Sequence, residues 1–105
     1  MTYIRSCMRG ILIAYRLRTP HDPNVASALV KRLYGQNTSS QGGKYQYRRK
    51  GLLDEVPSVR LIRGVIIVEK KNKKKILELL EEFDAEVYVR EVVLIRKDLK
   101  ALGVE

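Results

Sequence analysis

The sequence predicts an α+β fold, a ferredoxin-like sandwich in which strands and helices follow the order β-α-β-β-α-β. Runs rich in Ile, Leu and Val alternate with two segments of helical periodicity. A short echo also links the two halves of the chain, because residues 9–13 read RGILI and residues 63–67 read RGVII. Two right-handed crossovers would place both helices on one face of a four-stranded antiparallel sheet. The two strands that carry the echo would then be central.

The first part of the chain predicts a strand and a helix. Residues 9–18 form an apolar run with β-branched side chains, which favours a buried strand. Asp22 suits the N-cap of a helix and Pro23 suits its first position, where a missing N–H costs nothing. The predicted helix spans residues 23–34 and stops at Gly35. Its apolar stripe consists of Val25, Ala26, Leu29, Val30 and Leu33.

The remaining elements complete a single domain over residues 1–105. Residues 36–51 are expected to form a basic flexible arm and, near residues 44–50, the second strand of the sheet. The later elements are a connection over residues 51–57, a third strand over 59–69, a second helix over 73–83, a fourth strand over 86–96, and a short helical turn or fraying tail over 97–105.

Both faces of the predicted sheet are apolar. In the first strand, Ile11 and Ile13 lie on one side, and Leu12 and Ala14 lie on the other. Helices cover only one of these faces in a sandwich of this kind. Because a large exposed apolar face is unusual in a monomer, we expect the sheet face or its edge to be buried in a homodimer.

Positive charge is concentrated in the first half of the chain. The net charge is +9, and residues 1–50 hold ten Lys and Arg against one acidic residue, whereas residues 51–105 hold eleven of each. From residue 36 to residue 51 the chain has no acidic residue, but it has four cations and two tyrosines. Cations pair with phosphates and tyrosine rings stack on bases, so this segment indicates a nucleic-acid-binding protein.

We expect RNA to be preferred somewhat over DNA, bound mainly through phosphate contacts. The third strand reads RLIRGVIIV and lacks the aromatic signature of the RNA recognition motif. Recognition of the backbone or of shape is therefore favoured over the reading of bases. The expected nucleic-acid-binding residues are Arg16, Arg18, Lys44, Tyr45, Tyr47, Arg48, Arg49 and Lys50.

Two other classes of function stay open. The turn before the first helix holds the sole histidine, His21, and Asp22, which could bind Mg²⁺ in a metal-dependent nuclease. Asp22 is already explained as a helix cap, so these two residues are weak catalytic candidates. Alternatively, the chain could be a structural or assembly protein that its basic arm holds within a larger complex.

The cysteine content and the apolar runs indicate the compartment. Cys7 is the only cysteine, so no internal disulfide and no Cys/His metal pattern is possible, and no metal or cofactor is expected. The apolar runs are shorter than a membrane span requires, and no signal-peptide core is evident. We expect a cytoplasmic protein without membrane contact. Abundant Lys, Glu, Ile and Val also hint at a thermophilic source.

Overall fold

The chain folds into two compact units. The computed structural model describes residues 8–18, 23–40 and 45–104, with the backbone alone for residues 37–40 and 45–47. One unit comprises Met1–Arg18 with Pro57–Glu105, and the other comprises Thr19–Val56. The first contains a four-stranded sheet and the second a two-stranded sheet. The predicted α+β class with a four-stranded antiparallel sheet is confirmed.

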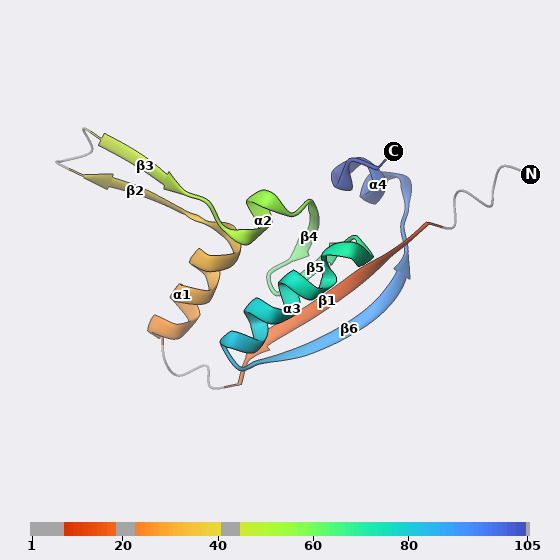
Figure 1. The fold of residues 1–105 in the computed structure, drawn as a ribbon, viewed down its shortest axis with the longest axis horizontal. Coiled ribbons are helices and arrows are strands. Elements are labelled where there is room, and N and C mark those ends of the chain that lie inside the picture. Colours follow the sequence, from red (N-terminus) through yellow and green to blue (C-terminus); the bar gives the residue numbers. More distant parts are fainter. Residues whose placement is uncertain (1–7, 19–22, 41–44, 105) are drawn as a thin grey trace, which may run out of the picture. The chain divides into compact units, whose positions relative to one another are not determined.

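The four-stranded sheet has the order β4-β5-β1-β6, and all neighbouring strands are antiparallel (Figure 1). The inner strands β1 and β5 are the two that contain most of the sequence echo. Side chains on both faces are buried, as Ile66 and Ile67 of β5 show, and this explains the apolar content. The strands are β1 (Arg9–Leu17), β4 (Ser58–Ile62), β5 (Val65–Val68) and β6 (Ala85–Val93).

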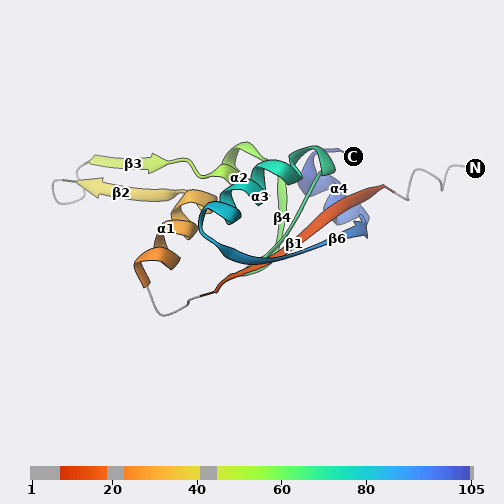
Figure 2. The ribbon, with the colours of Figure 1, turned by 60° about the horizontal axis from the view of Figure 1, so that its bottom comes forward.

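One face of this sheet is covered by α3 (Lys73–Glu82), which follows a 3₁₀ turn, η2 (Lys70–Asn72). Figure 2 shows α3 lying over one side of β1 and β6. Ile13 and Ile66 are paired across β1 and β5, and both are fully buried. The helix contributes Ile76, Leu79 and Leu80, which recur at helical spacing and are also buried. The second predicted helix is therefore confirmed to within one residue.

The opposite face is partly covered by α4 (Arg96–Leu102). Leu102 and Leu94 form a buried cluster with Ile67. Partly buried hydrophobic residues pack against that cluster, namely Leu12, Val59, Val92, Leu99 and Val104. Helix α4 ends at Gly103, whose φ of 73° is the left-handed conformation that glycine adopts without strain. The C-terminal segment is thus a packed helix, and it covers part of the sheet face that was expected to be free of helices.

The second unit begins with α1 (Pro23–Tyr34), whose predicted bounds are confirmed. Its stripe residues Leu29 and Leu33 are buried. Gly35 ends the helix with a φ of 86°, and its N–H donates to the carbonyl of Lys31. The chain then forms the antiparallel hairpin of β2 (Gln36–Ser40) and β3 (Tyr45–Arg49), followed by the short helix α2 (Leu52–Glu55).

The prediction for the second strand is wrong in its pairing. A strand does form near residues 44–50, but β3 pairs with β2 in a separate two-stranded sheet and not with the apolar strands. The polar segment expected as an arm supplies β2. Hydrophobic periodicity could not reveal this hairpin, because residues 36–49 contain no Ile, Leu or Val.

The prediction of one third strand over residues 59–69 is also wrong. The segment forms two strands, β4 and β5, joined by a tight turn at Arg63 and Gly64. Gly64 has a φ of 89°, and its carbonyl accepts the N–H of Tyr15 at 2.8 Å. Glycine inside an apolar run marks a chain reversal here, because a side chain would be strained at this φ. The four-stranded sheet is therefore completed by β4, and β3, which was predicted to belong to it, lies in the other sheet.

Candidate nucleic-acid interface

The β2–β3 hairpin places the basic residues of its second strand beside the start of its first. Gln36 lies opposite Arg49 and Asn37 lies opposite Arg48. Both arginines therefore lie at the base of the hairpin, next to the end of α1. Lys50 follows directly. The three consecutive cations are thus held on ordered backbone at one end of a hairpin that has no acidic residue.

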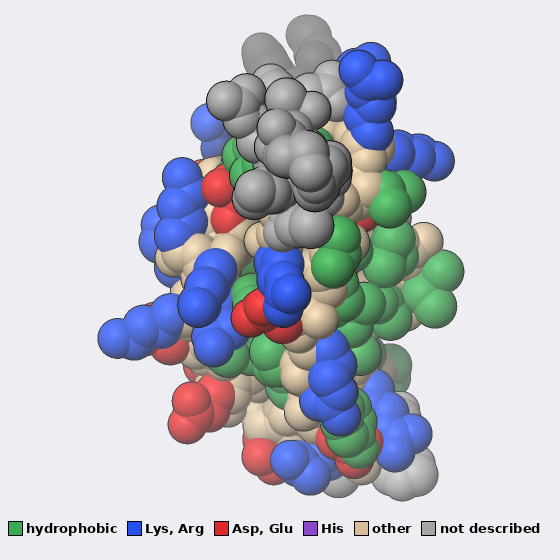
Figure 3. Space-filling model, turned by 90° about the vertical axis from the view of Figure 1, so that its right-hand side faces the viewer, with side chains coloured by type: hydrophobic (Ala, Val, Ile, Leu, Met, Phe, Trp, Pro, Cys, Tyr) green, Lys and Arg blue, Asp and Glu red, His purple; other side chains and the backbone are tan. Residues whose placement is uncertain are grey.

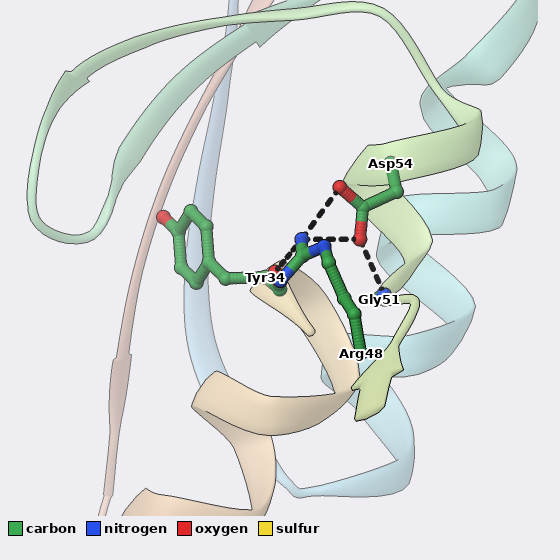
Figure 4. A network of polar contacts seen from close by, with 4 residues as sticks. All are labelled: Tyr34, Arg48, Gly51 and Asp54. Carbon is green, nitrogen blue, oxygen red and sulfur yellow. Dashed lines mark hydrogen bonds and ion pairs between the residues drawn. The ribbon is translucent and has the colours of Figure 1, made fainter. Parts of the chain in front are cut away.

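Arg48 is part of a polar network at this base (Figure 4). Its Nη2 donates to both carboxylate oxygens of Asp54 at 2.8 Å, and to the carbonyl oxygen of Tyr34 at 3.1 Å. Asp54 also accepts the backbone N–H of Gly51 at 2.7 Å, which caps the first turn of α2. One arginine side chain therefore joins the end of α1, strand β3 and the start of α2.

Two glycines allow the backbone to close tightly around this network. A Cβ atom added at Gly35 would lie 2.6 Å from the carbonyl oxygen of Arg49. A Cβ atom added at Gly51 would overlap the backbone nitrogen of Gly35. Because side chains at these positions would collide with backbone atoms, the base of the hairpin is fixed by glycine as well as by Arg48.

Arg49 and Lys50 differ from Arg48 in their surroundings. Both side chains are exposed, and neither forms an ion pair with a carboxylate in the described part of the chain. Arg48 is paired with Asp54 although 47% of its side chain is exposed. A phosphate could therefore contact Arg49 and Lys50 without breaking an existing ion pair, whereas at Arg48 it would compete with Asp54.

The other two candidate arginines belong to the sheet unit and pair with carboxylates there. Arg16 Nε donates to Glu86 Oε2 at 2.8 Å, and Arg18 lies 3.7 Å from Asp84. The hydrogen bond from Arg16 holds the pKa of Glu86 below its ordinary value, and the same bond raises the pKa of Arg16. The structure thus brings Arg48, Arg49 and Lys50 together but assigns Arg16 and Arg18 to the other unit.

Several predicted site residues lie outside the described residues. They include Lys44 and both weak catalytic candidates, His21 and Asp22. The backbone of Tyr45 and Tyr47 belongs to β3, as predicted. Within the described ranges, no group of three His, Cys, Asp or Glu side chains could hold a metal ion. In the same ranges, no helix has the length and apolar character needed to cross a membrane.

Gly51 is the last residue of the predicted arm, but Asp54 lies beyond it and was not predicted to belong to this region. A signal was present, because Gly51 and Asp54 have the spacing of a cap and the third residue of a helix. The partner of Arg48 could not be predicted in this way, since the pair depends on how β3 and α2 meet.

Comparison of the chain with protein-family models, curated proteins and solved structures finds no match.

Proposed function

We propose that this protein binds nucleic acid, with RNA preferred, through the β2–β3 hairpin. The observation that carries the proposal is an acid-free, polar hairpin that ends in two exposed cations, Arg49 and Lys50. Such a hairpin contributes no aliphatic side chain to a core, so its composition calls for a role outside the core. Neutralising phosphates with Lys and Arg releases counterions, which drives binding of any polyanion.

The remaining candidate residues have graded roles in this proposal. Lys44 adds a phosphate contact, and Tyr45 and Tyr47 provide rings on which bases stack. Arg48 mainly holds the base of the hairpin through Asp54. Arg16 and Arg18 make weaker contributions, since a phosphate would compete with their carboxylate partners. A phosphate-dominated interface of this kind binds many sequences.

Duplex DNA is a second candidate ligand, because the two-stranded form of the hairpin suits one of its grooves. The major groove of B-form DNA admits a two-stranded β-ribbon, whereas the major groove of A-form RNA is too deep and narrow for side chains to read. The β2–β3 ribbon, with two arginines at the end of β3, has the two-stranded form that this mode of binding requires. Single-stranded RNA and duplex DNA are therefore the two ligands to compare.

The finer fold assignment is also a proposal. If the β2–β3 hairpin is an insertion between α1 and β4, the remaining order is β1-α1-β4-β5-α3-β6. This order and the sheet order β6-β1-β5-β4 support a ferredoxin-like arrangement.

A single cysteine in the whole chain supports a location in the cytoplasm.

A pair of matched variants tests the binding proposal. Arg49→Ala/Lys50→Ala removes the two exposed hairpin cations, and Lys74→Ala/Lys75→Ala removes two exposed cations from α3. The hairpin variant should bind a labelled single-stranded RNA more weakly, with a salt slope smaller by about 2, because each lost phosphate contact lowers the slope by about 1. The α3 variant should bind almost like the wild type. Equal binding by the wild type and the hairpin variant would refute the assignment.

A further inference from the structure

We propose that two copies of this chain associate through the outer edge of β6, as antiparallel strands related by a two-fold axis at Tyr88. This proposal does not depend on nucleic-acid binding. Strand β6 lies at one end of the sheet and pairs only with β1 among the described strands. Its outer edge therefore presents backbone N–H and C=O groups that a further strand can bind.

The two edges of the sheet differ in their suitability for pairing. Strand β4, at the other edge, has five residues and an irregular register between Arg60 and Ile62. Strand β6 has nine residues in unbroken register with β1, and it contains no proline. Short, bulged edges resist the addition of a strand, whereas long, regular edges invite it.

Hydrophobic side chains remain exposed on and near β6. Tyr88 is 52% exposed and Val93 is 55% exposed. Figure 3 shows exposed hydrophobic side chains gathered on one side of this view, with Lys and Arg side chains among and around them. Pairing through β6 would cover part of the exposed surface of Tyr88, in addition to the strand edge.

The backbone of β6 determines which of its residues face outward. The N–H of Leu94 donates to the carbonyl of Met8 on the β1 side. Because backbone groups alternate in direction along a strand, the N–H and C=O groups of Val87, Val89 and Glu91 point away from β1. Arg90 Nη1 donates to the carbonyl of Val89 at 2.7 Å. A side chain thus occupies an outward carbonyl that a neighbouring strand would otherwise bind.

Charge selects one register among those that the backbone allows. In an antiparallel pair of this kind, residues whose backbone groups point outward must lie opposite one another. This condition allows the two-fold axis to lie at Tyr88 or at another residue of β6, and each position of the axis defines one register. Centring on Tyr88 places Val87 opposite Val89 of the second copy, where the two residues exchange both backbone hydrogen bonds. It also places Glu86 opposite Arg90 of the second copy, twice, in positions where side chains approach closely.

Registers centred on the neighbouring residues lose this complementarity. A centre on Val89 places Glu86 opposite Val92, and a centre on Val87 places Glu86 opposite Tyr88. In the proposed register, the Arg90 side chain leaves the carbonyl of Val89 and forms an ion pair with Glu86 of the second copy. The carboxylate of Glu86 already accepts Arg16 Nε at 2.8 Å and the Tyr88 hydroxyl at 3.1 Å, both on Oε2. Oε1 is the oxygen that the second copy's Arg90 would contact.

A charge reversal tests the interface. Arg90→Glu replaces two opposite-charge pairs by two like-charge pairs, so the dimer dissociation constant measured by sedimentation equilibrium should rise about tenfold or more. Arg63→Glu makes the same charge change in the exposed β4–β5 turn and should leave the dissociation constant unchanged. Circular dichroism checks that both variants fold. A wild-type chain that stays monomeric at high concentration would overturn the proposal, and so would equal effects of the two variants.

A cysteine scan tests the register. In a Cys7→Ser background, Tyr88→Cys should form a disulfide-linked dimer under mild oxidation, because two opposed residues lie within the range a disulfide can bridge. Arg90→Cys should not, since its copies would be offset by four residues, or about 13 Å along the strands. Cross-linking at Arg90→Cys, or its absence at Tyr88→Cys, would rule out this register.

Discussion

The four-stranded sheet and the β2–β3 hairpin reach ordered structure by different chemistry. The sheet is built from aliphatic residues, and Ile13, Ile66 and Val68 within it have no exposed surface. The hairpin has no aliphatic residue in either strand, and its base is held by Arg48, Asp54 and two glycines. Apolar burial thus stabilises one region, whereas polar contacts and close backbone packing anchor the other. Beside this polar anchor, the side chains of Arg49 and Lys50 are exposed.

The largest expected effect comes from the sheet. Ile66→Ala removes a fully buried side chain from β5, so the free energy of unfolding should fall by about 2–5 kcal/mol. Urea denaturation followed by circular dichroism measures this change. Ile62→Ala is the matched control, because Ile62 is 70% exposed and its truncation should change stability by less than about 0.5 kcal/mol. Equal losses would contradict the placement of the core.

A smaller effect is expected at the base of the hairpin. Arg48→Ala removes the side chain that joins α1, β3 and α2, and the pair with Asp54 is partly exposed, so the loss should be about 1 kcal/mol. The amides of β2 and β3 should exchange with solvent faster, while those of β1 and β5 should not change. Arg49→Ala is the control and should leave hairpin exchange as in the wild type. Similar exchange in the two variants would show that Arg48 has no anchoring role.

These regions also differ in how far the sequence could predict them. Helix α1 and strand β1 were predicted closely, because Pro23, Gly35 and the apolar run that begins at Gly10 are local signals. The hairpin partner of β3 was not predicted, since strand pairing between polar segments leaves no periodic pattern. The position of Asp54 beside Arg48 depends on how distant elements meet. The exposed cations were predictable from charge, but their division into anchoring and available residues was not.

The smallest expected effect is a dependence on pH at the sheet. The bond from Arg16 lowers the pKa of Glu86 in the folded protein, so the stabilisation is present above the unfolded value of about 4.3 and is lost as pH falls through the lower folded value. Glu86→Gln should therefore lower the melting temperature slightly at pH 7 and have no effect near pH 2. Glu78→Gln, at an exposed position of α3, should have little effect at pH 7. A Glu86→Gln effect that persists in acid would argue against the ion pair as its cause.

Binding of the wild-type protein across a salt series is the most direct test of the central claim. Labelled single-stranded RNA, duplex RNA and duplex DNA would be titrated at several salt concentrations. The proposal expects dissociation constants in the micromolar range or tighter at low salt, with a steep loss of affinity as salt rises. Tightest binding of single-stranded RNA would support the proposed preference and stacking on β3, whereas tightest binding of duplex DNA would contradict that preference and favour the two-stranded ribbon in a major groove. Absence of binding to all three at low salt would contradict the proposed function.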